Sequence, residues 1–135
     1  MFHLKTRTDY GLMIMVELAK NKQAIMSLSG LAKNLNISSI YLIQISRVLA
    51  RAGLIKSREG SRGGYFLARS ASRISVLEIL EILDGPISPR CLSRHKKICP
   101  GLANCSLPLI WEHILGDIKT SLHKKTLASL VKLIS

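Results

Sequence analysis

Acidic residues are scarce in this chain of 135 residues, where eight Asp and Glu stand against 20 Lys and Arg and the net charge is +12. The excess lies mainly in residues 1–75, which hold twelve basic and three acidic side chains, against eight and five in residues 76–135. A merely basic surface would not require such a concentration. The imbalance favours a polyanionic partner, and we expect that partner to be a nucleic acid.

Aromatic residues are also few, with one Trp, three Tyr and two Phe, so Leu and Ile must build most of the core of this single domain's worth of chain. No apolar run approaches the roughly 20 residues that cross a bilayer. Glu17 interrupts the early apolar stretch that would otherwise resemble a signal peptide. The three cysteines are an odd number, which fits a compartment where disulfides are rare. We therefore expect a cytoplasmic protein without a membrane partner.

Two helices joined by a tight turn are expected between residues 28 and 52. Leucines at helical spacing predict the first over residues 28–35, and Ser38 would cap a second that ends near Ala52. The inner face of the second helix would consist of Leu42, Ile45, Leu49 and Ala52. Its outer face carries Ser, Gln and Arg, which can pair with base edges or phosphates. Taken alone, that face is also typical of a solvated helix, but the whole pattern predicts a helix-turn-helix.

A glycine-rich hairpin follows directly, with strands expected over residues 54–58 and 65–69. Glycine allows positive φ and a close approach to DNA phosphates, and Arg62 at the tip suits a narrow minor groove. A loop that binds nucleotide phosphates is the competing interpretation, but no Lys-Ser or Lys-Thr follows the glycines. The hairpin therefore predicts the wing of a winged helix. The residues expected to contact DNA are Ser38, Ser39, Tyr41, Gln44, Arg47, Arg51, Arg58, Arg62, Gly63, Gly64 and Tyr65.

Four further helices are expected. The first covers residues 8–20, with Thr6 or Thr8 as its cap, and the next begins at a capping box of Ser75 and Glu78 and ends at Gly85. A long helix should run from Ser106 to about Leu122, and a last short helix should follow a cap at Thr126. The long helix bears an apolar stripe too wide for one chain of this size to cover, formed by Leu107, Ile110, Trp111, Ile114, Leu115, Ile118 and Leu122. Such a stripe predicts a two-fold homodimer.

We therefore expect a mainly α fold with a small β-hairpin. Residues 1–85 would form a winged helix-turn-helix DNA-binding domain, residues 86–106 a cysteine-containing loop, and residues 107–135 a dimerisation helix with a terminal short helix.

All three cysteines, Cys91, Cys99 and Cys105, lie in one loop that proline and glycine keep free of helical or strand periodicity. Their spacing is too wide for a zinc knuckle built on a CxxC pair. Three interpretations stay open: an iron–sulphur cluster with one further ligand, a structural zinc completed by His95, and free thiols without metal. No catalytic dyad or second cofactor motif accompanies them, so we do not expect an enzyme.

Several segments together resemble the Rrf-two family of bacterial winged-helix transcription regulators. They are Thr8-Asp9-Tyr10-Gly11, Ser39 to Gln44, Gly63-Gly64-Tyr65, the three spaced cysteines and Thr126-Leu127. The family includes the iron–sulphur-cluster assembly regulator, the nitric-oxide-sensing repressor and the rhizobial iron regulator. The resemblance implies a homodimer that binds a near-palindromic operator of double-stranded DNA. It also implies a 2Fe–2S or 4Fe–4S cluster on Cys91, Cys99 and Cys105 whose state tunes the affinity for DNA.

The resemblance also bears on the fourth ligand of such a cluster. The assembly regulator has a histidine three residues after its last cysteine, where this chain has Pro108. In the nitric-oxide-sensing repressor an aspartate reaches the cluster across the dimer, and the matching residue here is Asp9. Alternatively, the negative charge of Asp9 only interacts favourably with the positive end of the helix dipole. His95 and His113 remain further candidates.

The predicted function is thus a homodimeric DNA-binding transcription regulator that senses iron–sulphur cluster, iron, or redox and nitric-oxide status. The alternative is a zinc-stabilised or metal-free winged-helix regulator that responds to a small metabolite. Glu59 departs from the family pattern, because many members carry Arg before the first wing glycine. Arg58 or Arg62 would then have to make the contact with the minor groove.

Overall fold

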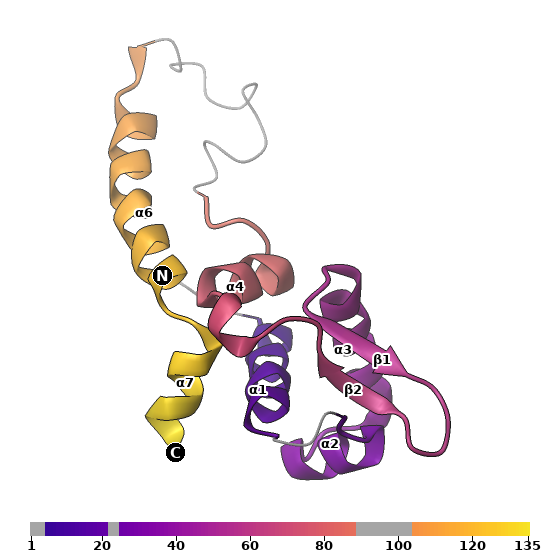
Figure 1. Cartoon of the computed structure of the whole chain (residues 1–135). Coiled ribbons are helices and arrows are strands. Elements are labelled where there is room, and N and C mark those ends of the chain that lie inside the picture. Colours follow the sequence, from indigo (N-terminus) through magenta and orange to yellow (C-terminus); the bar gives the residue numbers. More distant parts are fainter. Residues whose placement is uncertain (1–4, 22–24, 89–103) are drawn as a thin grey trace.

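The computed structural model describes residues 5–21, 25–88 and 104–135 (Figure 1). These residues form a mainly helical fold with one antiparallel hairpin, in the predicted order. The elements are α1 (Thr6–Lys20), α2 (Leu28–Leu35), α3 (Ser39–Arg51), β1 (Ile55–Arg58), β2 (Gly64–Leu67), the 3-10 helix η1 (Ala71–Arg73), α4 (Val76–Asp84), α6 (Leu107–Lys124) and α7 (Leu127–Ile134). Among the helices of these residues, none is both long and apolar enough to cross a membrane.

Side-chain caps and one left-handed residue define the helix-turn-helix. Ser27 caps α2, and Ser38 caps α3 by accepting a hydrogen bond from the backbone N–H of Tyr41 at 3.2 Å. Between the two helices Asn36 has φ of 53°, which reverses the chain in a short turn. Gly53, with φ of 78°, follows the last turn of α3 as predicted. A serine cap contributes about 1 kcal/mol because it bonds a backbone N–H that would otherwise lack a partner in the first turn, and Ser38 therefore favours a helix start at Ser39.

The hairpin is fastened to the segment that precedes α2. Within the hairpin, Ile55 pairs with Leu67, and the strands end close to their predicted positions. Met26 adds a further bridge: its backbone N–H donates to the Tyr65 carbonyl at 2.9 Å, and the Tyr65 N–H donates to the Met26 carbonyl at 2.8 Å. No local pattern in the sequence indicates this pairing. It holds the wing in a fixed position relative to the helix-turn-helix.

One apolar core joins the hairpin with the helices around it. Its fully buried members come from α1, α2, α3, β1, α4, α7 and the segments before β1 and after η1. They are Ile14, Met15, Leu31, Leu42, Ile45, Leu49, Leu54, Ile55, Ile74, Ile79, Leu83 and Leu127. The predicted inner face of α3 is confirmed at Leu42, Ile45 and Leu49, but Ala52 is exposed, because it lies beyond the last residue of the helix.

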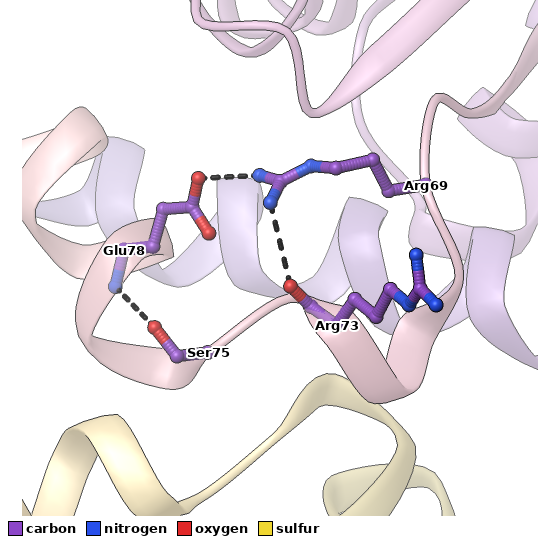
Figure 2. Close-up of polar contacts among 4 residues, drawn as sticks. All are labelled: Arg69, Arg73, Ser75 and Glu78. Carbon is purple, nitrogen blue, oxygen red and sulfur yellow. Dashed lines mark hydrogen bonds and ion pairs between the residues drawn. The ribbon is translucent and has the colours of Figure 1, made fainter.

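Polar contacts hold the start of α4 against the end of the hairpin (Figure 2). The Ser75 hydroxyl accepts the backbone N–H of Glu78 at 3.1 Å, which is one half of the predicted capping box. The Glu78 carboxylate pairs with the guanidinium of Arg69. Arg69 also donates to the carbonyl oxygen of Arg73 at 3.4 Å. Arg69 is therefore a structural cation that braces the segment between β2 and α4.

Besides the confirmed caps at Ser38 and Ser75, the predicted cap of α7 is confirmed and that of α1 is wrong, while Ser106 stands at the predicted N-cap position of α6 without a capping bond. Helix α1 already begins at Thr6 with Lys5 at its N-cap, and Thr8 is buried inside the helix. Ser106 has helical φ and ψ at the start of α6, and it makes no side-chain capping bond within the described residues. Thr126 does cap α7, in a reciprocal capping box with Ser129 in which both hydrogen bonds are 3.1 Å.

The C-terminal helices have different surroundings. Helix α6 lies beside α4 and extends beyond it, and its buried residue is Leu115 (Figure 1). Helix α7 packs back against the core through two backbone hydrogen bonds at its start. The N–H of Leu127 donates to the carbonyl oxygen of Ile74 at 2.9 Å, and the N–H of Val76 donates to the carbonyl oxygen of Lys125 at 2.9 Å. The end of α6 is therefore anchored, while much of its apolar surface is left uncovered by the described residues.

Candidate DNA interface and cluster ligands

Helix α3 has one buried face and one exposed face. Leu42, Ile45 and Leu49 are fully buried, whereas Gln44 and Arg47 are exposed on the opposite side. Ser38, Ser39 and Arg51, which were also predicted to contact DNA, are exposed as well. The helix therefore presents hydrogen-bonding side chains to solvent from its first turn to its last, as a recognition helix requires.

Tyr41 differs from the other predicted contact residues of α3. Its side chain is half-buried and packs against the core. The ring lies edge to face with that of Tyr10 on α1, with the ring centroids 5.6 Å apart and the planes at 87°. Tyr41 thus joins α3 to α1, and any contact with DNA would come from the edge of the ring that remains accessible.

Four arginines surround this exposed surface. Arg47 and Arg51 lie on α3, Arg58 ends β1, and Arg62 lies in the turn between the strands; all four are exposed. Among the described residues, none of the four makes an ion pair or a side-chain hydrogen bond, in contrast to Arg69. Their charges are not neutralised by the described protein and are available to phosphates.

The two wing glycines have a packing role in addition to any role in DNA binding. A Cβ atom at Gly63 would lie 2.1 Å from the carbonyl oxygen of Arg58, and one at Gly64 would lie 2.1 Å from that of Met26. Both neighbours are backbone atoms that cannot move aside. The hairpin therefore requires glycine at both positions, and Tyr65 beside them is half-buried against the core.

The predicted cluster ligands fall only partly within the described residues. Cys91, Cys99 and the alternative ligand His95 lie outside them. Cys105 is a half-buried free thiol two residues before α6, and Asp9 is exposed in the first turn of α1. Within the described ranges, no three His, Cys, Asp or Glu side chains come together as a possible metal site.

The residues that precede Asp9 contact the end of α4. Arg7 donates to the carbonyl oxygen of Leu83 at 2.6 Å, and the Lys5 ammonium lies 3.3 Å from a carboxylate oxygen of Asp84. These contacts fix the start of α1 to the end of α4, which immediately precedes the cysteine-containing segment. Lys5 and Arg7, which precede Asp9 by four and two residues, thus have partners on α4, whereas the Asp9 carboxylate makes no ion pair within the described part of the chain.

Two residues of this surface were not identified from the sequence. Tyr10 was noted only as part of a motif, and its contact with Tyr41 joins residues from different helices, so no local pattern indicates it. Ile40 is 73% exposed at the start of α3. The exposure of Ile40 could have been predicted from the sequence, because Ile40 precedes Gln44 by one helical turn and so lies on the polar face of the helix rather than on its apolar stripe.

Comparisons with known proteins show the family of this chain. Residues 4–133 match the Rrf2 family model, described as an iron-dependent transcriptional regulator. The HTH-type transcriptional regulator CymR of Bacillus subtilis is 42% identical over 87 residues, which cover 64% of this chain and 63% of that protein. The HTH-type transcriptional regulator IscR of Cereibacter sphaeroides is 30% identical over 134 residues, covering 96% and 86%. The solved structure of B. subtilis CymR, described as that organism's global cysteine regulator, has a TM-score of 0.77 at 34% identity and covers 98% of each chain.

Proposed function

The chain belongs to the Rrf2 family of transcriptional regulators, and from that premise we propose that it binds its operator as a homodimer and senses iron–sulphur status through its three cysteines. The family and the winged-helix fold agree with the sequence prediction. The named relatives are transcriptional regulators, which also agrees with the prediction that the chain is not an enzyme.

The observation that carries the DNA-binding part is the set of four exposed arginines without a partner among the described residues. Arg47 and Arg51 flank the exposed Gln44 on α3, while Arg58 and Arg62 extend from the wing. With α3 in the major groove, Gln44 would read a base edge and the α3 arginines would bind phosphate or guanine. Arg62 would enter the adjacent minor groove. Glu59 is exposed in the same turn, so it can point away from the phosphates.

The apolar surface of α6 supports the homodimer. Leu107, Ile110 and Ile114 lie on one side of the helix and are 44%, 51% and 43% exposed. A second copy of α6 packed against this side would bury them and place two winged domains on one face of a duplex. Two-fold related recognition helices read half-sites about one helical turn apart, which fits a near-palindromic operator.

The described members of the donor set are compatible with a cluster. Cys105 is free, and Asp9 has no competing ion pair among the described residues. We assign Cys91, Cys99 and Cys105 as thiolate ligands and Asp9, from the partner chain, as the fourth. A bound cluster supplies iron whose ligation changes with redox state. Because Cys105 lies two residues before α6, its ligation would tie the loop to the dimerisation helix and so influence the spacing of the recognition helices.

A second function has a specific observation in its favour. The relative with 42% identity over 87 residues is CymR, and the solved B. subtilis protein is described as a global cysteine regulator. A zinc-stabilised or metal-free chain that responds to a small metabolite would use the same DNA-binding surface. The two functions therefore differ in what the chain senses, not in how it reads DNA.

Two measurements on protein purified without oxygen test the proposal. Iron and sulphide analysis with visible absorption should show a brown protein with broad charge-transfer bands, which Cys91→Ser, Cys99→Ser and Cys105→Ser each remove. Colourless protein with one zinc per chain, or with no metal, would favour the alternative function.

The second measurement is a titration of duplexes enriched from a random library, with and without cluster, at several salt concentrations. Arg62→Ala should reduce the salt slope by about 1, as loss of one phosphate contact does. Lys132→Ala, an exposed cation on α7, is the control. Equal slopes for both variants would contradict the assigned role of Arg62.

A further inference from the structure

Ile40 occupies an unusual position for an aliphatic residue. It is the second residue of α3, and 73% of its surface is exposed. Of the large hydrophobic residues described before α6, only Met13 is also exposed, at 44%. Ile40 is absent from the apolar core and from the side chains packed against it. Its side chain therefore contributes little to the stability of the described fold.

Helical geometry places Ile40 on the DNA-facing side of α3. Gln44, Arg47 and Arg51 follow it four, seven and eleven residues later, which is the spacing of one helix face, and all three are exposed. The Ser38 cap fixes the first turn, where Ile40 lies. In helix-turn-helix proteins the N-terminal residues of the recognition helix contact base edges, so Ile40 would be among the residues deepest in the groove.

The chemistry of the major groove then limits what Ile40 can contact. Guanine, adenine and the amino group of cytosine present donors and acceptors, which an aliphatic side chain would desolvate without replacing their hydrogen bonds. Thymine alone among the four bases presents a methyl group. We propose that Ile40 is a specificity-determining residue that packs against the C5 methyl group of a thymine in each half-site. This inference rests on the proposed use of α3 for DNA reading.

The test removes the methyl group from the DNA and the side chain from the protein. Duplexes are first enriched from a random library with the wild-type protein, and each thymine is then replaced by uracil, symmetrically in both half-sites. One such replacement should weaken binding of the wild type roughly fourfold per half-site, the value of one buried methyl group. Ile40→Ala should weaken binding to the original duplex and should lose this sensitivity to uracil at that position.

A matched control and a change of preference sharpen the test. Leu133 on α7 is 80% exposed, so Leu133→Ala removes an equally exposed aliphatic side chain and should leave the uracil series unchanged. Ile40→Asn offers an amide that pairs with adenine and should shift the preferred base from thymine to adenine at the same position. Thermal unfolding should be unaffected in all three variants, because both side chains are exposed.

The outcomes separate this inference from the proposed function. If the wild type enriches no sequence, the proposed DNA-reading surface and the role of Ile40 both fail. If it enriches a site and Arg47→Ala weakens binding, but no thymine is sensitive to uracil, only the role of Ile40 is overturned. That role is overturned as well if the effects of Ile40→Ala and of uracil simply multiply at every thymine.

Discussion

The ring of Tyr41, in the first turn of α3, lies edge to face against the ring of Tyr10 on α1, with 5.6 Å between the ring centroids. Both residues also pack against the core. An aromatic pair of this geometry contributes about 0.5–1.5 kcal/mol beyond the area that it buries. The orientation of the recognition helix therefore depends partly on a residue that lies on a different helix.

Replacing Tyr10 should consequently affect DNA binding from a distance. We expect Tyr10→Leu to lower the free energy of unfolding by about 1 kcal/mol, because the aromatic pair is lost. The same change should weaken operator binding, since the first turn of α3 loses a support. Tyr41→Phe keeps the ring and removes only the hydroxyl, so it isolates any direct contact with DNA. Chemical denaturation and duplex titration measure both effects, and a Tyr10→Leu protein with wild-type affinity would contradict the supporting role.

Ser46 within α3 and Ser38 at its N-cap should respond to alanine in opposite directions. Ser46 is fully buried, and its hydroxyl has no hydrogen-bond partner among the described residues. Burial of an unpaired hydroxyl is costly, so Ser46→Ala should leave the free energy of unfolding unchanged or raise it by about 1 kcal/mol. Ser38→Ala should lower it by about 1 kcal/mol, because the helix cap is lost. Parallel urea titrations compare the pair, and a clear destabilisation by Ser46→Ala would mean that its hydroxyl is in fact bonded.

Gly11 on α1 packs closely against Leu83 of α4. A Cβ atom there would lie 2.5 Å from a terminal carbon of Leu83, which is itself fully buried. Gly11→Ala should therefore cost about 1–3 kcal/mol through overpacking. Gly116 on α6 has open space around it and provides the control, where Gly116→Ala should stabilise the helix by about 0.5–1 kcal/mol. Thermal unfolding that showed both glycines equally tolerant of alanine would refute the close packing of α1 on α4.

Local signals predicted most of the helices and the hairpin. The serine caps at Ser38 and Ser75, the capping Thr126 and the glycines of the wing act over a few residues, so they can be recognised in the sequence alone. The resemblance at Asp9, Tyr41 and the wing correctly identified the family. The prediction failed at the start of α1, where Lys5 rather than Thr6 or Thr8 stands at the N-cap, and in part at α6, where Ser106 makes no side-chain capping bond among the described residues.

Contacts between distant segments could not be predicted in the same way. The bridge of Met26 to Tyr65, the pair of Tyr10 and Tyr41, and the bond from Arg7 to the Leu83 carbonyl join residues far apart in the sequence. Each depends on the final packing of whole elements rather than on a repeated pattern. Arg69 shows the consequence: its charge was counted with the basic front half, yet it is paired with Glu78 and is not available to the proposed DNA-binding surface.

The uncovered side of α6 should be the dimer interface. Ile114→Asp or Trp111→Asp would place a charge among apolar residues and should convert the dimer to a monomer that binds its operator at least tenfold more weakly, because one half-site offers few contacts. Leu109 is 70% exposed and lies on the opposite side of α6, so Leu109→Asp is the matched control and should remain dimeric. Analytical ultracentrifugation distinguishes the species. Dimers formed equally by all three variants would place the interface elsewhere.

Asp9 provides the sharpest test of the proposed cluster. Its carboxylate is exposed and without an ion pair among the described residues, and the start of α1 is fixed to the end of α4 beside the cysteine-containing segment. A carboxylate is a harder ligand than thiolate and holds iron less firmly, which suits a site that must respond to its surroundings. If Asp9 only favours the helix dipole, its removal should cost about 0.3–1 kcal/mol of stability and leave the cluster unchanged. We expect instead that Asp9→Ala, reconstituted without oxygen, alters the visible absorption and circular dichroism of the cluster or speeds its decay, while His95→Ala leaves both as in the wild type. The reverse pattern would assign the fourth ligand to His95, and the role of Asp9 would then be limited to its favourable charge at the start of α1.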